Sequence, residues 1–204
     1  MNKSLMVKII SVLNVILLLA IFIVSIPIFQ SFAYRTNGFI LNTDYILTFV
    51  PHQDFGATTI SHFNEALWNW NSTVGMSLMS REPTLRHNTT GYPDNDNKHY
   101  IYREAIDDIN AVAQTTIYRS AWPNEHVIKS ADILINMKYS FSNGNQSNTY
   151  DTWSAFMHEA GHAAGLDHTE IKNINVVMYE DLFYNQIKRS LHQDDINGVK
   201  SIYN

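Results

Sequence analysis

Residues 157–169 read Met-His-Glu-Ala-Gly-His-Ala-Ala-Gly-Leu-Asp-His-Thr, and the three histidines in this stretch have the spacing of metal ligands. His158 and His162 are four residues apart, so on a helix their rings project from nearly the same face, roughly 40° apart around the axis. Two neutral imidazoles in that arrangement can bind one zinc ion at about 2.0–2.1 Å each. The chain has no cysteine. Any metal must therefore be held by His, Asp or Glu, and a thiolate nucleophile is excluded.

The residues around this histidine pair complete a pattern typical of a catalytic metal site. Glu159 lies about 100° further round the same helix, where its carboxylate can reach a water on the metal rather than the metal itself. Gly165 permits the left-handed backbone that ends a helix, and the resulting turn can return His168 to the ion as a third ligand. Three protein ligands leave one position open for water, as in catalytic zinc sites. We therefore predict one catalytic zinc ion held by the three histidines, with Glu159 as the catalytic residue.

The segments that must position this motif alternate between strand-like and helix-like patterns. Strand character is found in residues 45–50, 76–79, 98–103, 113–119 and 131–137. Apolar residues at helical spacing mark residues 59–70, with Thr58 or Thr59 as N-cap, and residues 152–164 and 191–203. Turn-forming residues predict surface loops at 86–97 and 140–149. This order predicts an α/β or α+β sandwich, in which helices cover a mixed sheet.

The N-terminal segment has the pattern of an export signal. Two lysines and no acid precede an uncharged stretch from Ile9 to Phe29, and Ala33 is the small residue expected at a signal-peptidase site. The same stretch could also span about 30 Å of hydrocarbon, so a membrane tether through residues 9–29 is the alternative. The lysines keep the N-terminus in the cytoplasm in both cases. We predict residues 1–33 as a signal peptide or membrane anchor, and residues 34–204 as a secreted or membrane-anchored catalytic domain.

Charge composition bears on possible partners. The chain has 14 Lys and Arg against 19 Asp and Glu, a formal net charge of −5. This balance argues against binding nucleic acid, which uses a basic surface. The run Asp94-Asn95-Asp96-Asn97 is rich in oxygen ligands and is a candidate Ca²⁺ site. A solvated turn is the favoured interpretation, because no EF-hand spacing follows.

The pattern His-Glu-x-x-His-x-x-Gly-x-x-His followed by a methionine, here Met178, is the metzincin signature. Within that group the chain resembles the matrixins, the family of the matrix metalloproteases and their bacterial relatives. The segments Leu191–Tyr203 and His62–Asn71 are also similar to matrixin helices. The resemblance implies an α+β domain with a twisted, mixed five-stranded sheet, one antiparallel edge strand at 113–119, a zinc-site helix and a C-terminal helix. It also implies a monomer that hydrolyses extended extracellular polypeptides through a Glu-activated, zinc-bound water.

Further roles follow from the same resemblance. Met178 would lie beneath the zinc, Asp195 would brace the turn containing it, and Asp194 would hold the new α-amino group, on Tyr34 after cleavage behind Ala33. A simpler role for both acids is to stabilise the positive end of the last helix. Gln114 stands where matrixins with a second, structural zinc have a histidine, so we expect a single zinc ion. A latency mechanism based on a cysteine switch is excluded.

Two other assignments remain open. In gluzincin-type peptidases a downstream glutamate is the third ligand, and Glu180 follows His162 at a suitable distance. That assignment leaves Gly165 and His168 without a role. The second alternative is a catalytically inactive binding module with the metzincin fold, against which the intact Glu159 argues. Glu180 also replaces the usual matrixin proline after the methionine turn, so we expect an altered specificity pocket.

Overall fold

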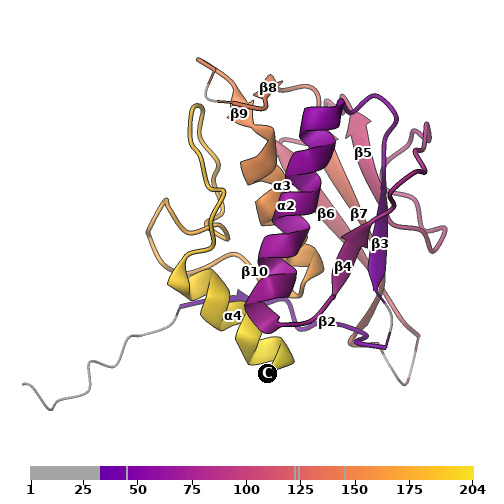
Figure 1. Cartoon of the computed structure of the whole chain (residues 1–204), viewed down its shortest axis with the longest axis vertical. Helices are drawn as coiled ribbons and strands as arrows, with labels where there is room; N and C mark the ends of the chain where they lie inside the picture. The colour runs from indigo at the N-terminus through magenta and orange to yellow at the C-terminus, as the bar shows by residue number, and fades with distance from the viewer. Residues whose placement is uncertain (1–32, 45, 122, 124, 145) are drawn as a thin grey trace, which may run out of the picture. The chain divides into compact units, whose positions relative to one another are not determined.

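The computed structural model describes residues 33–204, apart from 45, 122, 124 and 145. The expected signal or anchor segment therefore lies outside the described residues, as does its uncharged stretch 9–29. None of the helices that are described is long and apolar enough to cross a membrane. The described part consists of one main sheet and the helices α2, α3 and α4 (Figure 1).

The main sheet has the strand order β4-β3-β5-β7-β6. Strand β6 is antiparallel to β7, and the other neighbouring pairs are parallel. The strands are β3 (Leu47–Pro51), β4 (Met79–Arg81), β5 (Tyr100–Glu104), β6 (Ala113–Arg119) and β7 (Val127–Asn136). The two-residue strand β2 (Ile40–Leu41) pairs with the start of β7. The predicted mixed sheet with one antiparallel edge strand is confirmed, and the bounds of β6 are those expected from the sequence.

The helices are α2 (Ala57–Val74), α3 (Thr152–Ala163) and α4 (Gln193–Tyr203). Helices α2 and α3 lie side by side against the sheet, and α4 lies near their lower ends in the view drawn (Figure 1). The buried face of α2 presents Phe63, Leu67 and Trp70 to the core, as the helical spacing predicts. Phe156 of α3 packs against Phe63, with 4.3 Å between ring centroids. The fold is α+β, as predicted.

Several predicted boundaries differ from the structure, among them the start of β7 at Val127 rather than at 131, and two of the differences have local reasons. Helix α2 begins after Gly56, which provides no side-chain cap, rather than at Thr58 or Thr59. The Thr59 hydroxyl instead donates to the Asn143 side chain at 3.0 Å. The strand expected at 76–79 begins only at Met79, because the Asn71 carboxamide oxygen accepts the backbone N–H groups of Leu78 and Met79 and holds the preceding residues in a turn.

The segment before β3 forms strand pairs that the sequence pattern does not predict. Strand β1 (Arg35–Thr36) pairs in antiparallel fashion with β10 (Leu166–Asp167). The Asn37 side chain donates to the carbonyl of His162 at 3.0 Å, and the Asn37 backbone N–H donates to Gly165 at 2.9 Å. Residues 35–37 are therefore hydrogen-bonded to the end of the motif helix and to the strand that follows it. A further short pair joins β8 (Phe141–Ser142), at the start of the loop predicted at 140–149, to β9 (Tyr150–Asp151), directly after it.

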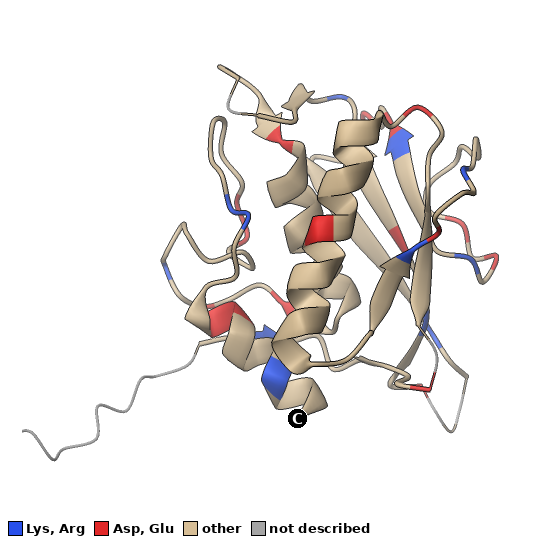
Figure 2. Ribbon diagram, viewed as in Figure 1, with Lys and Arg blue, Asp and Glu red and all other residues tan. Residues whose placement is uncertain are grey.

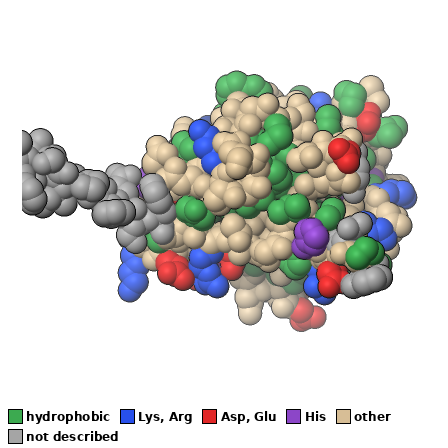
Figure 3. Space-filling view, turned by 90° about the horizontal axis from the view of Figure 1, so that it is seen from below, with side chains coloured by type: hydrophobic (Ala, Val, Ile, Leu, Met, Phe, Trp, Pro, Cys, Tyr) green, Lys and Arg blue, Asp and Glu red, His purple; other side chains and the backbone are tan. Residues whose placement is uncertain are grey.

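Charged side chains of both signs are spread over the described surface. Blue Lys and Arg and red Asp and Glu residues are scattered along the elements and loops of the ribbon in Figure 2. The face drawn in Figure 3 shows acidic, basic and hydrophobic side chains side by side. In these views the described residues carry mixed charge, whereas surfaces that bind nucleic acid are predominantly basic.

Candidate metal centre and active-site cleft

Three histidine side chains converge on one point. The Nε2 atom of His158 lies 3.1 Å from Nε2 of His162 and 3.2 Å from Nε2 of His168. All ligand atoms of the three residues lie within 4.8 Å of one another. Nitrogen atoms about 2.0–2.1 Å from a tetrahedral zinc ion are themselves roughly 3.3 Å apart. The described side chains therefore have the spacing that one zinc ion requires.

In two of these histidines, the hydrogen bond made by Nδ1 determines the tautomer, and so determines whether Nε2 has a lone pair directed at the metal centre. Nδ1 of His158 lies 2.7 Å from the carbonyl oxygen of Val177, and Nδ1 of His162 lies 2.9 Å from that of Leu166. A carbonyl only accepts, so each Nδ1 carries the proton and each Nε2 presents a lone pair. Burial lowers the pKa of His158 well below its ordinary value and that of His162 to about 4, so both rings are neutral at pH 7. Lone pairs this close favour a cation between them.

Helix α3 and the turn after it deliver the three rings. Asp151 caps the helix, because its carboxylate accepts the backbone N–H of Ser154 at 2.8 Å. The helix ends before Gly165, whose φ of +98° is the left-handed conformation that glycine favours. A Cβ atom at Gly165 would lie 2.4 Å from the carbonyl oxygen of Phe39, so a side chain cannot be accommodated. Strand β10 follows and, paired with β1, leads the chain directly to His168.

Met178 lies against the helix that carries the first two histidines. Its sulfur is 2.3 Å from the position that a Cβ atom on Gly161 would occupy, so the two residues approach as closely as glycine allows. The Asp195 carboxylate accepts the backbone N–H groups of Val177 and Met178, each at 3.0 Å. Val177 is also the carbonyl partner of His158. Asp195 thus links the start of α4, through this turn, to the metal centre.

Asp194, the residue before Asp195, accepts hydrogen bonds from a different set of groups. Its carboxylate accepts the backbone N–H of Ala33 at 3.1 Å and the hydroxyl of Thr169 at 2.7 Å. The sequence-based expectation placed the new terminal amino group on Tyr34. In the structure, Ala33, one position earlier, donates its backbone N–H to Asp194.

Glu159 lies beside the histidine cluster and is only 4% exposed. Burial raises the pKa of its carboxyl group to about 8, and a hydrogen bond from Thr115 opposes this shift. The Thr115 hydroxyl lies 2.7 Å from Oε2 of Glu159. Thr115 is not among the site residues that the sequence predicts. Alternation along the predicted strand 113–119 places it on one face, but nothing in the sequence pairs that face with the helix.

A cleft of about 680 Å³ runs past the histidines and Glu159. Its lining includes residues of β6 and the segment before it, and residues of the loop after Met178, among them Leu182 and Phe183. Tyr139 and Tyr150 add aromatic surface. Glu180 lies in the cleft wall but does not belong to the three-histidine group, which is the one His/Cys/Asp/Glu cluster with metal-binding spacing among the described residues. The alternative ligand set with Glu180 is therefore not formed there.

The oxygen-rich run at Asp94–Asn97 is engaged in other contacts. The Asp96 carboxylate lies 3.0 Å from the ammonium group of Lys98. The backbone N–H of Asp94 donates to the buried Asp132 carboxylate at 3.0 Å. Calcium binding at this run stays a prediction.

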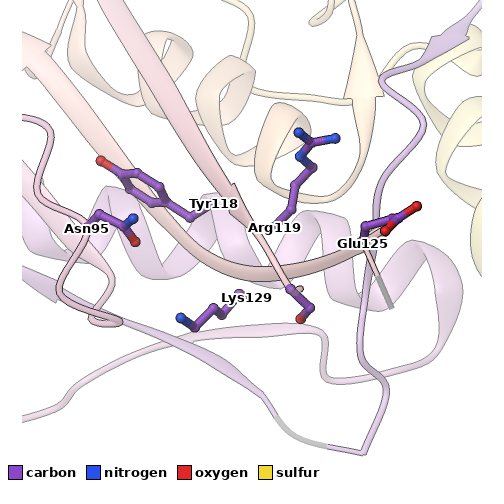
Figure 4. Close-up of a pocket in the computed structure, with 6 residues that line it drawn as sticks. Asn95, Tyr118, Arg119, Glu125 and Lys129 are labelled. Carbon is purple, nitrogen blue, oxygen red and sulfur yellow. The ribbon is translucent and has the colours of Figure 1, made fainter. Parts of the chain in front are cut away.

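A second cavity, of about 400 Å³, lies at the far end of β6 and β7. Its lining combines both charge signs with polar groups: Asn95, Tyr118, Arg119, Ser120, Glu125 and Lys129 (Figure 4). It shares none of these residues with the histidine-lined cleft.

The fold and the histidine cluster together are those of a metzincin-type catalytic domain. The model of the matrixin family matches residues 49–204, so the chain belongs to the matrixins and is a zinc metalloprotease. One solved structure that it resembles is high choriolytic enzyme 1, a hatching enzyme zinc-protease from Oryzias latipes (Medaka fish). The two share 11% identity over 86% of this chain and 96% of that chain, with a TM-score of 0.40. The GM1-bound form of the ECX AB5 holotoxin aligns at 12% identity over 84% and 87%, with a TM-score of 0.44. No curated protein sequence matches this chain.

Proposed function

We propose that this matrixin is an endopeptidase that hydrolyses peptide bonds within extended extracellular polypeptides. The three histidines hold one zinc ion in this proposal, and Glu159 is the general base. The observation that carries it is the convergence of three Nε2 atoms at 3.1–3.2 Å beside a buried carboxylate. An inactive binding module would have no need for that carboxylate.

The position of β6 supports an extended polypeptide as substrate. Strand β6 pairs with β7 on one side, and no other described strand pairs with it. Residues of β6 also line the cleft beside the histidines. A peptide in extended conformation can add to such an edge, where main-chain hydrogen bonds provide affinity with little sequence preference.

The chain's own groups perform the proton transfers of the proposed reaction. A bound zinc ion supplies Lewis acidity, which lowers the pKa of water to about 7 and polarises the scissile carbonyl. Glu159 accepts the proton of the attacking water and then donates it to the leaving amine. Positioned proton transfer of this kind contributes roughly 10²–10⁴ in rate. His158 and His162 stay in the required tautomer because backbone carbonyls hold their Nδ1 protons.

The location of the enzyme is also a proposal. Residues 1–33 direct residues 34–204 out of the cytoplasm, either as a cleaved signal or as an anchor. The support is the lysine-flanked uncharged stretch 9–29. Expression of the full chain, with N-terminal sequencing of protein recovered from medium and membranes, distinguishes the two forms. Retention of the whole chain in the cytoplasm would contradict both.

Casein or gelatin zymography tests the proposed activity. Wild-type protein should clear the substrate, and Glu159→Ala should not. His126→Ala is a suitable control, because His126 is exposed and lies outside the histidine cluster. An inactive wild type, folded and loaded with zinc, would favour the binding-module alternative.

A further inference from the structure

The hydroxyl of Thr115 faces the carboxylate assigned here as general base. Its Oγ1 atom lies 2.7 Å from Oε2 of Glu159 and 3.0 Å from the backbone oxygen of the same residue. A hydroxyl has one proton and donates to one acceptor at a time. The carboxylate oxygen is the closer acceptor and, when ionised, the stronger one.

We propose that Thr115 is a positioning residue, which holds Oε2 of Glu159 so that Oε1 is left to accept the proton of the attacking water. This inference rests on the proposed role of Glu159. The carboxylate of a glutamate can rotate on its flexible side chain and leave the productive geometry. A hydrogen bond to one of its oxygens restricts it to one orientation. Thr115 suits this role because it lies in a paired strand rather than in a loop.

The register of β6 provides a matched control. Side chains alternate between the two faces of a strand. Thr115 therefore contacts helix α3, whereas Thr116 lies on the opposite face with its hydroxyl 2.8 Å from the hydroxyl of Tyr92. Both threonines are partly buried and each makes a side-chain hydrogen bond. Thr116→Val removes a comparable hydroxyl without touching Glu159.

A purely structural role is the alternative. The contact with the backbone oxygen of Glu159 could serve only to join β6 to α3. In that case Thr115→Val would lower the melting temperature but leave the turnover of the folded enzyme unchanged. A positioning role lowers kcat instead, with little change in KM or in zinc content.

The experiment compares wild type, Thr115→Val, Thr115→Ser and Thr116→Val with a fluorogenic peptide, together with zinc content and melting temperature. We expect Thr115→Val to retain its zinc and to lose roughly 10- to 100-fold in kcat, as is usual for groups that orient a metal-site residue. Thr115→Ser should recover most of that loss, because serine restores the hydroxyl. Thr116→Val should keep the wild-type kcat.

A second measurement uses the metal-free protein and needs no activity. Urea unfolding midpoints of wild type, Thr115→Val, Glu159→Ala and the double variant form a cycle that isolates the coupling between the two side chains. Thr115→Val should lower the midpoint less when Glu159 is already alanine. Additive losses, an unchanged kcat in Thr115→Val, or a serine variant as impaired as the valine variant would overturn the inference. An inactive wild type would instead contradict the proposed function on which it rests.

Discussion

The backbone N–H of Ala33 donates to Oδ1 of Asp194 at 3.1 Å, which joins the first described residue to the start of the last helix. The Ala33 carbonyl accepts in turn from the Thr169 hydroxyl at 3.2 Å and from the backbone N–H of Glu170 at 3.0 Å. Thr169 follows His168 directly and also donates to Asp194 at 2.7 Å. Ala33, Thr169 beside the third histidine and helix α4 therefore share one hydrogen-bond network.

We expect protein that begins at Ala33 to be more stable than protein that begins at Tyr34. A free amino group has a pKa near 8 and is largely charged at neutral pH, so on Ala33 it would form an ion pair with the buried Asp194 carboxylate. A gain of about 1 kcal/mol raises the melting temperature by roughly 2–4 °C in a domain of this size. Calorimetry of the two forms measures the difference, which Asp194→Asn should abolish. Equal melting temperatures in all of these proteins would rule out the ion pair.

Asp195→Ala should weaken both the fold and the metal site. Its carboxylate accepts three backbone N–H groups, from Val177, Met178 and His192. The donors of Val177 and Met178 are buried, and a buried donor left without an acceptor costs about 1–3 kcal/mol, so we expect the free energy of unfolding to fall by about 2–6 kcal/mol. Zinc affinity should fall roughly tenfold or more, because Val177 orients His158. Urea unfolding and competition with a zinc chelator measure the two effects, with exposed Asp44→Ala as the control. Unchanged values in both assays would refute a bracing role.

Gly161→Ala tests the close contact between Met178 and helix α3. The added methyl group would lie 2.3 Å from the Met178 sulfur and 2.8 Å from a ring carbon of Trp70, so both side chains must move. Overpacking of this kind costs about 1–3 kcal/mol. Gly144→Ala is the matched control, because a Cβ atom there has no neighbour within 4 Å. Thermal unfolding of the two variants should show a clear loss for Gly161→Ala alone, and equal melting temperatures would mean that Met178 does not pack as described.

Lys188 provides a prediction about pH. The residue is 4% exposed and its ammonium donates to the carbonyl of Asp181 at 2.7 Å. Burial lowers its pKa from 10.5 to about 8, so the folded state disfavours the charged form. The destabilisation caused by charged Lys188 is fully present below pH 8 and disappears as the pH rises towards 10.5. Wild type should therefore gain stability relative to Lys188→Met between pH 8 and pH 10, as measured by urea unfolding. A difference that is constant with pH would contradict the lowered pKa.

The sequence predicted elements that depend on local patterns, some of them weak. Strand 113–119 and the end of the motif helix before Gly165 were placed correctly, because alternation and a glycine with positive φ are local properties. The convergence of His158, His162 and His168 followed from helical spacing and that same glycine turn. These features depend on few residues, all close together along the chain.

Contacts between distant segments could not be predicted in the same way. Strands β1 and β2 are only two residues long and have no period, so their pairing with β10 and β7 depends on tertiary structure. The sequence likewise contains no sign that Asn37 would bind the end of α3 or that Thr115 would face Glu159. The contact of Asp195 with the Met178 turn was expected only through the resemblance to matrixins.

The most direct test of the account is a zinc titration of metal-free protein, with peptide hydrolysis followed at each addition. We predict no activity without metal, a linear rise with added zinc and a plateau at one zinc ion per chain. His168→Ala should show no such rise below a large excess of zinc, because the third ligand is missing. Activity that persists in the metal-free protein, or a plateau that requires two tightly bound ions per chain, would contradict the single three-histidine zinc site.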